Sequence, residues 1–360
     1  MDRRPFRIGV AAKVIAIASV ASFGMVVLAP AAGAGPAAAR RPASAAWSSA
    51  GNPKRAVVQT RAVFLGGKVY MPGGFTTGFV AYGHMQRLNT ATGAWSAESE
   101  TVPSGTIGQA AVCTDGSKVY VVGGIVASAI VSMTQVYDPA VAAGSRWSTG
   151  VNPHTTAEGN LYVRDGGCAW IGGKLYLFGG QAVTDNGGIN GISDFTWVFD
   201  PASGQWSDTG FSMRVANWIF GYTSNSTTAF VLGGENTAGT YLRDAEKFRP
   251  AHGWTKLPAL PVPPGAPAGT GLAWPGAGFL SSGLVVFGGV SQASTNAYQT
   301  RLLVCANPCT SSSTWTDAQN NLTTGRSDFA AATSGGTTPT VYAICGLGAS
   351  GYLADAETTS

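Results

Sequence analysis

A short apolar run that ends in glycine recurs along the chain and constrains its fold more than any other feature. Five copies read KVYMPGG, KVYVVGG, KLYLFGG, TAFVLGG and GLVVFGG, and their first glycines are Gly73, Gly123, Gly179, Gly233 and Gly288. A sixth copy, TVYAICG, has Cys345 in place of the first glycine. Intervals of 50 to 57 residues indicate one supersecondary unit that is repeated six times.

Each unit has the pattern of four strands. An apolar strand and a turn such as TDGS precede the glycine-ended run, and two further strands follow it. The third strand carries an aromatic residue at one position (Tyr137, Phe199 and Phe248, but Leu88 in the first copy). The fourth strand carries a tryptophan, namely Trp95, Trp147, Trp206, Trp254 or Trp315. One small sheet cannot bury both of its faces alone, whereas sheets stacked around an axis bury them against one another.

Together the glycine doublets, the Asp-Pro turns after the third-strand aromatics and the fourth-strand tryptophans resemble the kelch-repeat β-propellers, of the secreted bacterial type. The resemblance implies an all-β, six-bladed propeller over residues 40–360. The last residues, YLADAETTS, match YLRDAEKFR of the fourth unit but have no tryptophan strand after them, while AAWSSAG near the N-terminus matches GAWSAES. We therefore expect the segment of Trp47 to supply the fourth strand of the last blade and to close the ring.

The N-terminus predicts export. Residues 1–39 combine a basic start, an apolar stretch from Val14 to Leu28 and a small-residue region, which is typical of a signal peptide. The RRPF sequence resembles the twin-arginine signal. A membrane anchor is the alternative, but the apolar stretch is shorter than the roughly 20 residues of a spanning helix. The sequence predicts a secreted or cell-surface protein with no membrane span after cleavage.

The distribution of charge argues against a nucleic-acid partner, and the spacing of the cysteines indicates which of them form a disulfide. The net charge is +4, but residues 1–39 carry four basic residues and one acidic residue, so the remainder is nearly neutral and a nucleic-acid partner is not expected. In CANPC, an Asn-Pro turn separates Cys305 from Cys309 and favours a local disulfide. Cys113, Cys168 and Cys345 lie in strand-like runs and are interpreted as buried thiols. We expect a monomer without a cofactor or a metal.

Arginines before the innermost strands give the candidate ligand site. Arg55, Arg214 and Arg326 lie in such segments, and Asn217 and Asp328 follow two of them. In a propeller these junctions converge on the mouth of the central channel, so a ring of guanidinium groups could hold a carboxylate, phosphate or sugar. The alternative is that the arginines only stabilise the turns.

Two enzyme hypotheses stay open beside recognition of a glycan or protein ligand. GGENTAGTYLRDAE resembles a stretch of the bacterial sialic acid mutarotases, and this resemblance implies Glu235 as proton acceptor and Arg243 as carboxylate-binding cation. Secreted kelch propellers also include copper-radical oxidases. His84, His154 and His252, the three histidines, do not form the pattern of that family. The main prediction is a binding module on a loop face.

Overall fold

The structure, a computed structural model, describes residues 46–155, 157–295 and 297–360. Every regular element in these ranges is a β-strand, as expected for an all-β chain. The predicted signal peptide lies outside the described residues. No helix in this part of the chain is long and apolar enough to cross a membrane.

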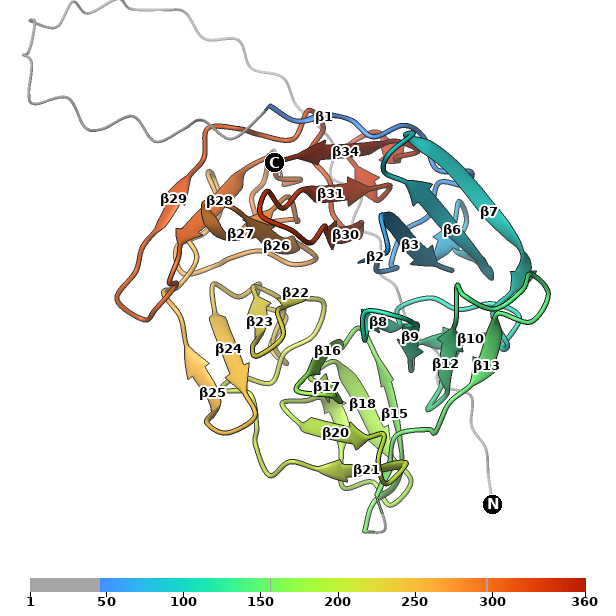
Figure 1. The fold of residues 1–360 in the computed structure, drawn as a ribbon. Coiled ribbons are helices and arrows are strands. Elements are labelled where there is room, and N and C mark those ends of the chain that lie inside the picture. The colour runs from blue at the N-terminus through green and yellow to red at the C-terminus, as the bar shows by residue number, and fades with distance from the viewer. Residues whose placement is uncertain (1–45, 156, 296) are drawn as a thin grey trace, which may run out of the picture. The chain divides into compact units, whose positions relative to one another are not determined.

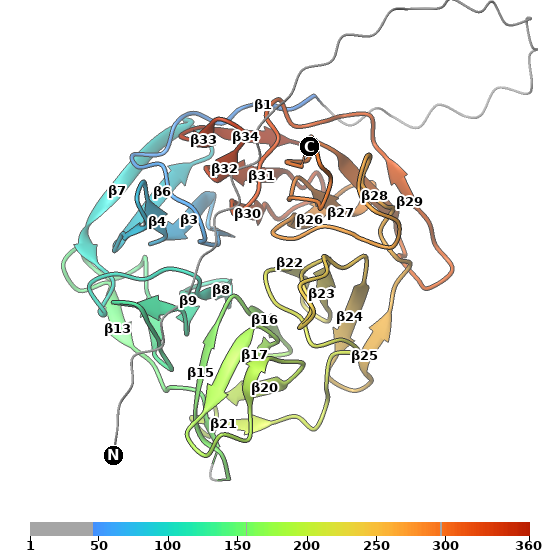
Figure 2. The same cartoon turned by 180° about the vertical axis from the view of Figure 1, so that it is seen from behind.

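Six four-stranded antiparallel sheets each hold one copy of the repeat, and Figures 1 and 2 show them arranged around a common centre. We number them repeat sheets 1 to 6 and give their strands from the centre outward. Sheet 1 is β2 (Val63–Leu65), β3 (Lys68–Pro72), β6 (His84–Asn89) and β7 (Ala94–Thr101); sheet 2 is β8 (Ala111–Thr114), β9 (Val119–Val122), β12 (Thr134–Tyr137) and β13 (Trp147–Thr149). Sheet 3 is β16 (Gly167–Ile171), β17 (Lys174–Phe178), β20 (Thr196–Asp200) and β21 (Gln205–Asp208); sheet 4 is β22 (Gly221–Ser224), β23 (Ala229–Leu232), β24 (Ala245–Arg249) and β25 (Gly253–Lys256). Sheet 5 is β26 (Gly276–Leu280), β27 (Gly283–Phe287), β28 (Leu302–Ala306) and β29 (Trp315–Asp317); sheet 6 is β30 (Ala330–Thr333), β31 (Val341–Ile344), β34 (Ala356–Thr359) and β1 (Ser48–Ser49).

Most of the remaining strands belong to the connections between second and third strands, and two precede the innermost strand of sheet 3. Three are two-residue hairpins: β4 (Phe75–Thr76) with β5 (Val80–Ala81), β10 (Ile125–Val126) with β11 (Ala129–Ile130), and β32 (Leu347–Gly348) with β33 (Gly351–Tyr352). A further four-stranded sheet forms beside repeat sheet 3, in the order β14 (His154–Thr155), β15 (Gly159–Arg164), β18 (Gln181–Thr184) and β19 (Asn190–Ile192). These hairpins stand at the same end of the repeat sheets as the loops that lead into the innermost strands.

The glycine doublets are required where one repeat sheet meets the next. Gly73 has a φ of 61°, and a Cβ there would lie 2.2 Å from the carbonyl oxygen of Ile107, which leads into sheet 2. Gly123 repeats this contact with Val163 at 2.2 Å. A side chain at these positions would force the sheets apart, so the doublet is a packing requirement and not a phosphate-binding loop.

The fourth-strand tryptophans tie each sheet to its neighbour. The rings of Trp95, Trp206 and Trp315 are buried, and their indole N–H groups donate to a distant backbone carbonyl: Trp95 to Ala50 at 2.9 Å, Trp206 to Val151 at 3.0 Å and Trp315 to Pro258 at 2.7 Å. A buried indole needs such an acceptor, and each bond therefore fixes both the ring and the linker that it reaches.

Repeat sheet 6 combines the two ends of the described chain. Strand β1 pairs with β34, with Ser48 opposite Thr358, and Figure 1 shows the blue N-terminal strand beside the red C-terminal one. Trp47 is 7% exposed, packs on Phe287 with ring centroids 5.4 Å apart, and donates from its indole to the carbonyl of Asn320 at 3.2 Å. The segment of Trp47 thus takes the place that the other tryptophan strands take in their sheets.

The cysteines differ in part from the sequence-based expectation. Cys305 and Cys309 form the expected local disulfide. Cys113 and Cys168 are not thiols, as interpreted above, but form a second disulfide between the innermost strands of sheets 2 and 3. Adjacent innermost strands bring their Cα atoms to 5.8 Å, a separation that suits a disulfide. Cys345 is a buried free thiol, and burial raises its pKa to about 12.

Candidate functional site at the centre of one face

Six residues, one before each innermost strand, meet at the centre of one face. Each has a positive φ, between 45° and 58°. In five of the six, all but Asp328, the backbone N–H donates to the carbonyl of the equivalent residue of the preceding sheet, at 2.7 to 3.2 Å. We call this group the rosette; its members are Gln59, Gln109, Asp165, Ile219, Trp274 and Asp328. The left-handed conformation is uncommon for such residues. The backbone bonds between neighbouring sheets hold it in place, so the side chains are fixed by the whole ring of sheets.

Polar side chains of the rosette form a continuous chain of hydrogen bonds. Arg164 Nη1 donates to Gln109 Oε1 at 2.8 Å, and Gln109 Nε2 donates to Gln59 Oε1 at 2.8 Å. Gln59 Nε2 in turn donates to Asp328 Oδ1 at 3.3 Å, and the other oxygen of Asp328 accepts from Ser327 Oγ at 2.7 Å. Donors that all point the same way reinforce one another, so the chain orients both amides.

Arg164 is held rigidly at one end of this chain. Its Nε donates to Gln181 Oε1 at 2.8 Å, and its Nη1 lies 3.4 Å from Asp165 Oδ2. The guanidinium carbon lies 4.9 Å from the ring centroid of Trp218, in cation–π contact. Four neighbours thus fix a cation whose side chain is only 13% exposed.

Glu235 stands next to this group on the adjacent sheet. Its backbone bridges to Trp218 on one side and to Tyr241 on the other, and its side chain is partly buried. Burial raises the pKa of the Glu235 carboxyl, while the indole of Trp218 acts in the opposite direction. Burial raises the pKa of Tyr241, and the negative charge of Glu235 raises it further. The carboxyl group is therefore easier to protonate than a solvated glutamate.

Two rosette carboxyl groups lie in the interior. Burial raises the pKa of Asp165 to about 7, against the attraction of Arg164 and Arg61, and it also raises the pKa of Asp328. Arg61 reaches across the channel, where its Nη2 donates to the carbonyl of Phe220 at 3.3 Å. The centre of the face therefore combines two buried acids with two cations that are already engaged.

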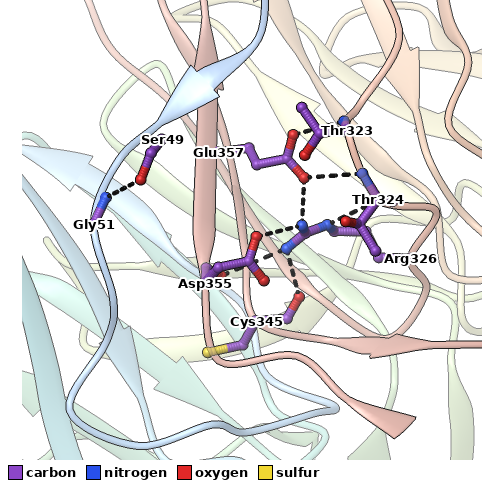
Figure 3. Close-up of polar contacts among 8 residues, drawn as sticks. All are labelled: Ser49, Gly51, Thr323, Thr324, Arg326, Cys345, Asp355 and Glu357. Carbon is purple, nitrogen blue, oxygen red and sulfur yellow. Dashed lines mark hydrogen bonds and ion pairs between the residues drawn. The ribbon is translucent and has the colours of Figure 1, made fainter. Parts of the chain in front are cut away.

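The three predicted arginines are not brought together. Arg55 and Arg214 are exposed, and their backbone N–H groups donate to Gln86 Oε1 at 2.7 Å and to Glu246 Oε2 at 3.0 Å. Arg326 is 0% exposed, so it does not face a ligand. Its guanidinium bonds to Asp355 Oδ2 at 2.8 Å, to Glu357 and to the carbonyl of Cys345 at 3.0 Å, as Figure 3 shows.

Asn217 and Arg243 also have structural partners. Asn217 is 2% exposed, and its Nδ2 donates to the carbonyl of Gly233 at 2.7 Å. Arg243 donates from Nε to the carbonyl of Leu260 at 2.5 Å, in the connection to sheet 5. No contact between Arg243 and Glu235 occurs among the residues that the structure describes. Of the predicted ligand residues, Asp328 alone belongs to the rosette.

Sequence reasoning missed Gln59, Gln109, Arg164 and Trp274. A signal existed, because in the first five units the rosette residue stands fourteen positions before the first glycine of the doublet. Aligning the units on the doublet would have marked this column, whose residues differ in chemistry from one sheet to the next. In the described ranges no three His, Cys, Asp or Glu side chains are grouped as they would be to hold a metal ion.

Comparisons with known proteins agree with the fold. A family model described as Kelch motif matches residues 108–153. The solved structure titled "Structure of YjhT" aligns with a TM-score of 0.64 at 17% identity, and the match covers 86% of this chain and 95% of that chain. No curated protein matches the sequence. At this identity the likeness concerns the fold, so the function must be argued from the site.

Proposed function

We propose that this chain, a kelch-repeat β-propeller, binds a carbohydrate at the rosette. One observation carries the proposal: a fixed chain of guanidinium, amide and carboxyl groups lies beside partly exposed tryptophans at the point where all six repeat sheets converge. Sites held on rigid scaffolds by loops commonly serve recognition. An ordered site of this kind needs little reorganisation when a ligand binds.

The hydrogen-bonding capacity of the rosette suits sugar hydroxyl groups. Each glutamine amide uses one N–H within the chain and has a second one, and Glu235 provides an acceptor. A sugar hydroxyl donates one hydrogen bond and accepts others, so it can bond to both kinds of group. The rings of Trp218 and Trp274 supply apolar surface against which the C–H groups of a sugar can pack.

A neutral sugar fits this site better than an anion. Arg164 already pairs with Asp165, Gln109 and Gln181, and Arg326 is buried in its own ion pairs. The carboxyl groups of Asp165, Asp328 and Glu235 make the surroundings acidic. A carboxylate or phosphate would therefore meet acidic groups and cations that are already paired.

A glycan-array screen of the purified protein, followed by calorimetric titration of the best glycan, tests the proposal. We expect Glu235→Gln to weaken binding by about 5- to 30-fold, which corresponds to the loss of roughly 1–2 kcal/mol from one hydrogen bond. Glu100→Gln is the matched control, because it makes the same change on β7, away from the rosette. Equal affinity of both variants, or the absence of any glycan ligand, would contradict the proposal.

A sugar-active enzyme of mutarotase type is the second candidate, and the raised pKa of Glu235 favours it. A half-buried carboxyl group beside a tyrosine can accept and return a proton during ring opening. Arg243 would not take part directly, because its Nε is bound to Leu260. NMR exchange between the anomeric signals of the bound sugar tests this function: accelerated exchange that Glu235→Gln abolishes would support it, and an unaccelerated rate would leave binding alone.

We propose as well that the protein is exported and that residues 1–39 are removed. The two disulfides support this proposal, since such bonds persist in oxidising compartments. Mass spectrometry of the protein from the culture medium of its host tests it. An N-terminus between residues 32 and 40 is expected, and a cell-associated chain that retains Met1 would argue against it.

A further inference from the structure

A cavity of about 780 Å³ occupies the central channel on the side opposite the rosette. Its walls come from the innermost strands of all six repeat sheets, and its mouth lies among the turns between first and second strands, such as Gly172-Gly173 and Ser334-Gly335-Gly336. A volume of this size is typical of small-molecule pockets. The carbohydrate proposed above binds at the other end of the channel, so the cavity is a separate site.

Two side chains cross the channel between the rosette and the cavity. Tyr222 extends from sheet 4 to sheet 2, where its hydroxyl donates to the carbonyl of Val112 at 3.0 Å and accepts from the N–H of Val112 at 2.8 Å. Arg61 crosses from sheet 1 to sheet 4, and its guanidinium carbon lies 5.7 Å from the centroid of the Tyr222 ring. Tyr222 is fixed at both ends and forms the floor of the cavity, whereas Arg61 is not among the lining residues.

The wall alternates in chemistry from one sheet to the next. Five positions after the rosette residue, each innermost strand presents a side chain to the cavity; in the order of sheets 1 to 6 these are Phe64, Thr114, Trp170, Ser224, Phe279 and Thr333. Three aromatic rings thus alternate with three hydroxyl groups around the axis. Two positions nearer the floor the side chains are small except Tyr222, which leaves the space empty: Ala62, Val112, Cys168, Ala277 and Ala331.

The cavity is nearly free of charge. Asp115 is the one charged side chain in its wall, and its Oδ1 already accepts from Ser117 and Lys118 while its Oδ2 accepts from the hydroxyl of Tyr120. These hydrogen bonds lower the pKa of Asp115 against the effect of burial. The lining residues include no cation for an anionic ligand, and most of their polar side chains are single hydroxyl groups.

The walls are also rigid. The disulfide between Cys113 and Cys168 lies in the wall and links sheets 2 and 3. Trp170 stacks on Tyr120 with centroids 5.2 Å apart, and Phe279 meets the edge of Phe230 at 5.5 Å. The aromatic rings are therefore held in place before any ligand arrives.

We propose that this cavity binds a neutral aromatic small molecule with one or a few hydroxyl groups, a phenol or naphthol in chemical class. Its ring would pack among the three aromatic side chains, and its hydroxyl would bond to one of the three alternating Ser and Thr hydroxyl groups. The proposal does not depend on the carbohydrate site.

Calorimetric titration with 1-naphthol tests the proposal, with 1-naphthoate as the anionic counterpart. We expect saturable 1:1 binding of naphthol and binding of naphthoate that is at least about tenfold weaker, because desolvating the carboxylate is not compensated by a cation. Ala331→Phe fills the cavity and should weaken naphthol binding by about tenfold or more. Ala202→Phe, the same change at an exposed turn of sheet 3, should have no effect, and neither should Glu235→Gln beside the rosette.

A second variant covers the case in which Ala331→Phe does not fold. Ser224→Ala removes one hydroxyl group from the wall without adding volume, and it should weaken naphthol binding by about two- to tenfold. Absence of naphthol binding, equal affinity for naphthoate, or wild-type affinity in both cavity variants would overturn the proposal. Loss of binding in Glu235→Gln with wild-type affinity in Ser224→Ala would place the ligand at the rosette and would also overturn it.

Discussion

Arg326→Met should destabilise the protein strongly, because it removes the cation from a buried ionic cluster. The guanidinium is 0% exposed and pairs with Glu357, whose side chain is 4% exposed, and with Asp355, which is 39% exposed (Figure 3). Asp355 can be hydrated after the substitution, but Glu357 cannot. Removing one partner of a buried pair typically costs about 3–5 kcal/mol, and here nearly all of the cost arises at Glu357.

The other repeat sheets show how this cost can be removed. The position of Glu357 is taken by Gln86 in sheet 1 and by Gln135 in sheet 2, and each amide accepts the backbone N–H of the loop before its innermost strand, from Arg55 and from Ser104. In these two sheets a neutral glutamine amide thus accepts the backbone N–H of the loop without a neighbouring arginine. The double variant Arg326→Met/Glu357→Gln should therefore recover to within about 1–1.5 kcal/mol of the wild type.

Urea denaturation at pH 7, followed by circular dichroism, measures both variants. The thermal midpoint of the single variant should fall by about 5–8 °C. A loss below about 1 kcal/mol, or a double variant no more stable than the single one, would refute the reasoning.

Three further outcomes follow from the structure. Burial raises the pKa values of Asp165 and Glu246 to about 7, so the folded state keeps protons that the unfolded state loses near pH 4. The free energy of unfolding should therefore decline as the pH rises from about 4 to 7. Glu246→Gln should make that decline smaller in urea titrations. Trp47→Ala should cost about 3–5 kcal/mol, because it removes a buried ring and the bond to Asn320, whereas a cost near zero would mean that β1 does not hold sheet 6 together. Replacing both cysteines of the disulfide between sheets 2 and 3 by alanine should cost about 2–4 kcal/mol, and the denatured, unreduced wild type should titrate a single thiol, that of Cys345; three thiols would contradict the second disulfide.

The repeat could be predicted from the sequence because every sheet packs against its neighbour through the same residue types at the same positions. The glycine doublet, as at Gly73, and the fourth-strand tryptophan, as at Trp95, recur because a Cβ in place of the first or the loss of the second would disturb the packing between neighbouring sheets in the same way. The local disulfide of Cys305 was predictable for a similar reason, since four residues and a turn fix the geometry.

The site could not be predicted in the same way, because its residues share a backbone position and not a chemistry. Gln109, Ile219 and Trp274 occupy equivalent places in the rosette. The arginines did not mark the site, because they do not share one position relative to the rosette. Arg326 stands two positions before its rosette residue and points into sheet 6, whereas Arg55 stands four positions before its own. The pairing of Cys113 with Cys168 depends on which innermost strands become neighbours, and the local sequence around a cysteine does not determine this.

The most direct test of the carbohydrate site is an NMR titration of the tryptophan indole N–H signals. The chain has ten tryptophans, and single Trp→Phe variants assign their signals in the ¹⁵N-labelled protein. On saturation with the glycan selected by array, the signals of Trp218 and Trp274 should shift, while that of Trp170 in the opposite cavity should not. A glycan that binds but shifts the signal of neither Trp218 nor Trp274 would contradict the claim that the carbohydrate binds at the rosette.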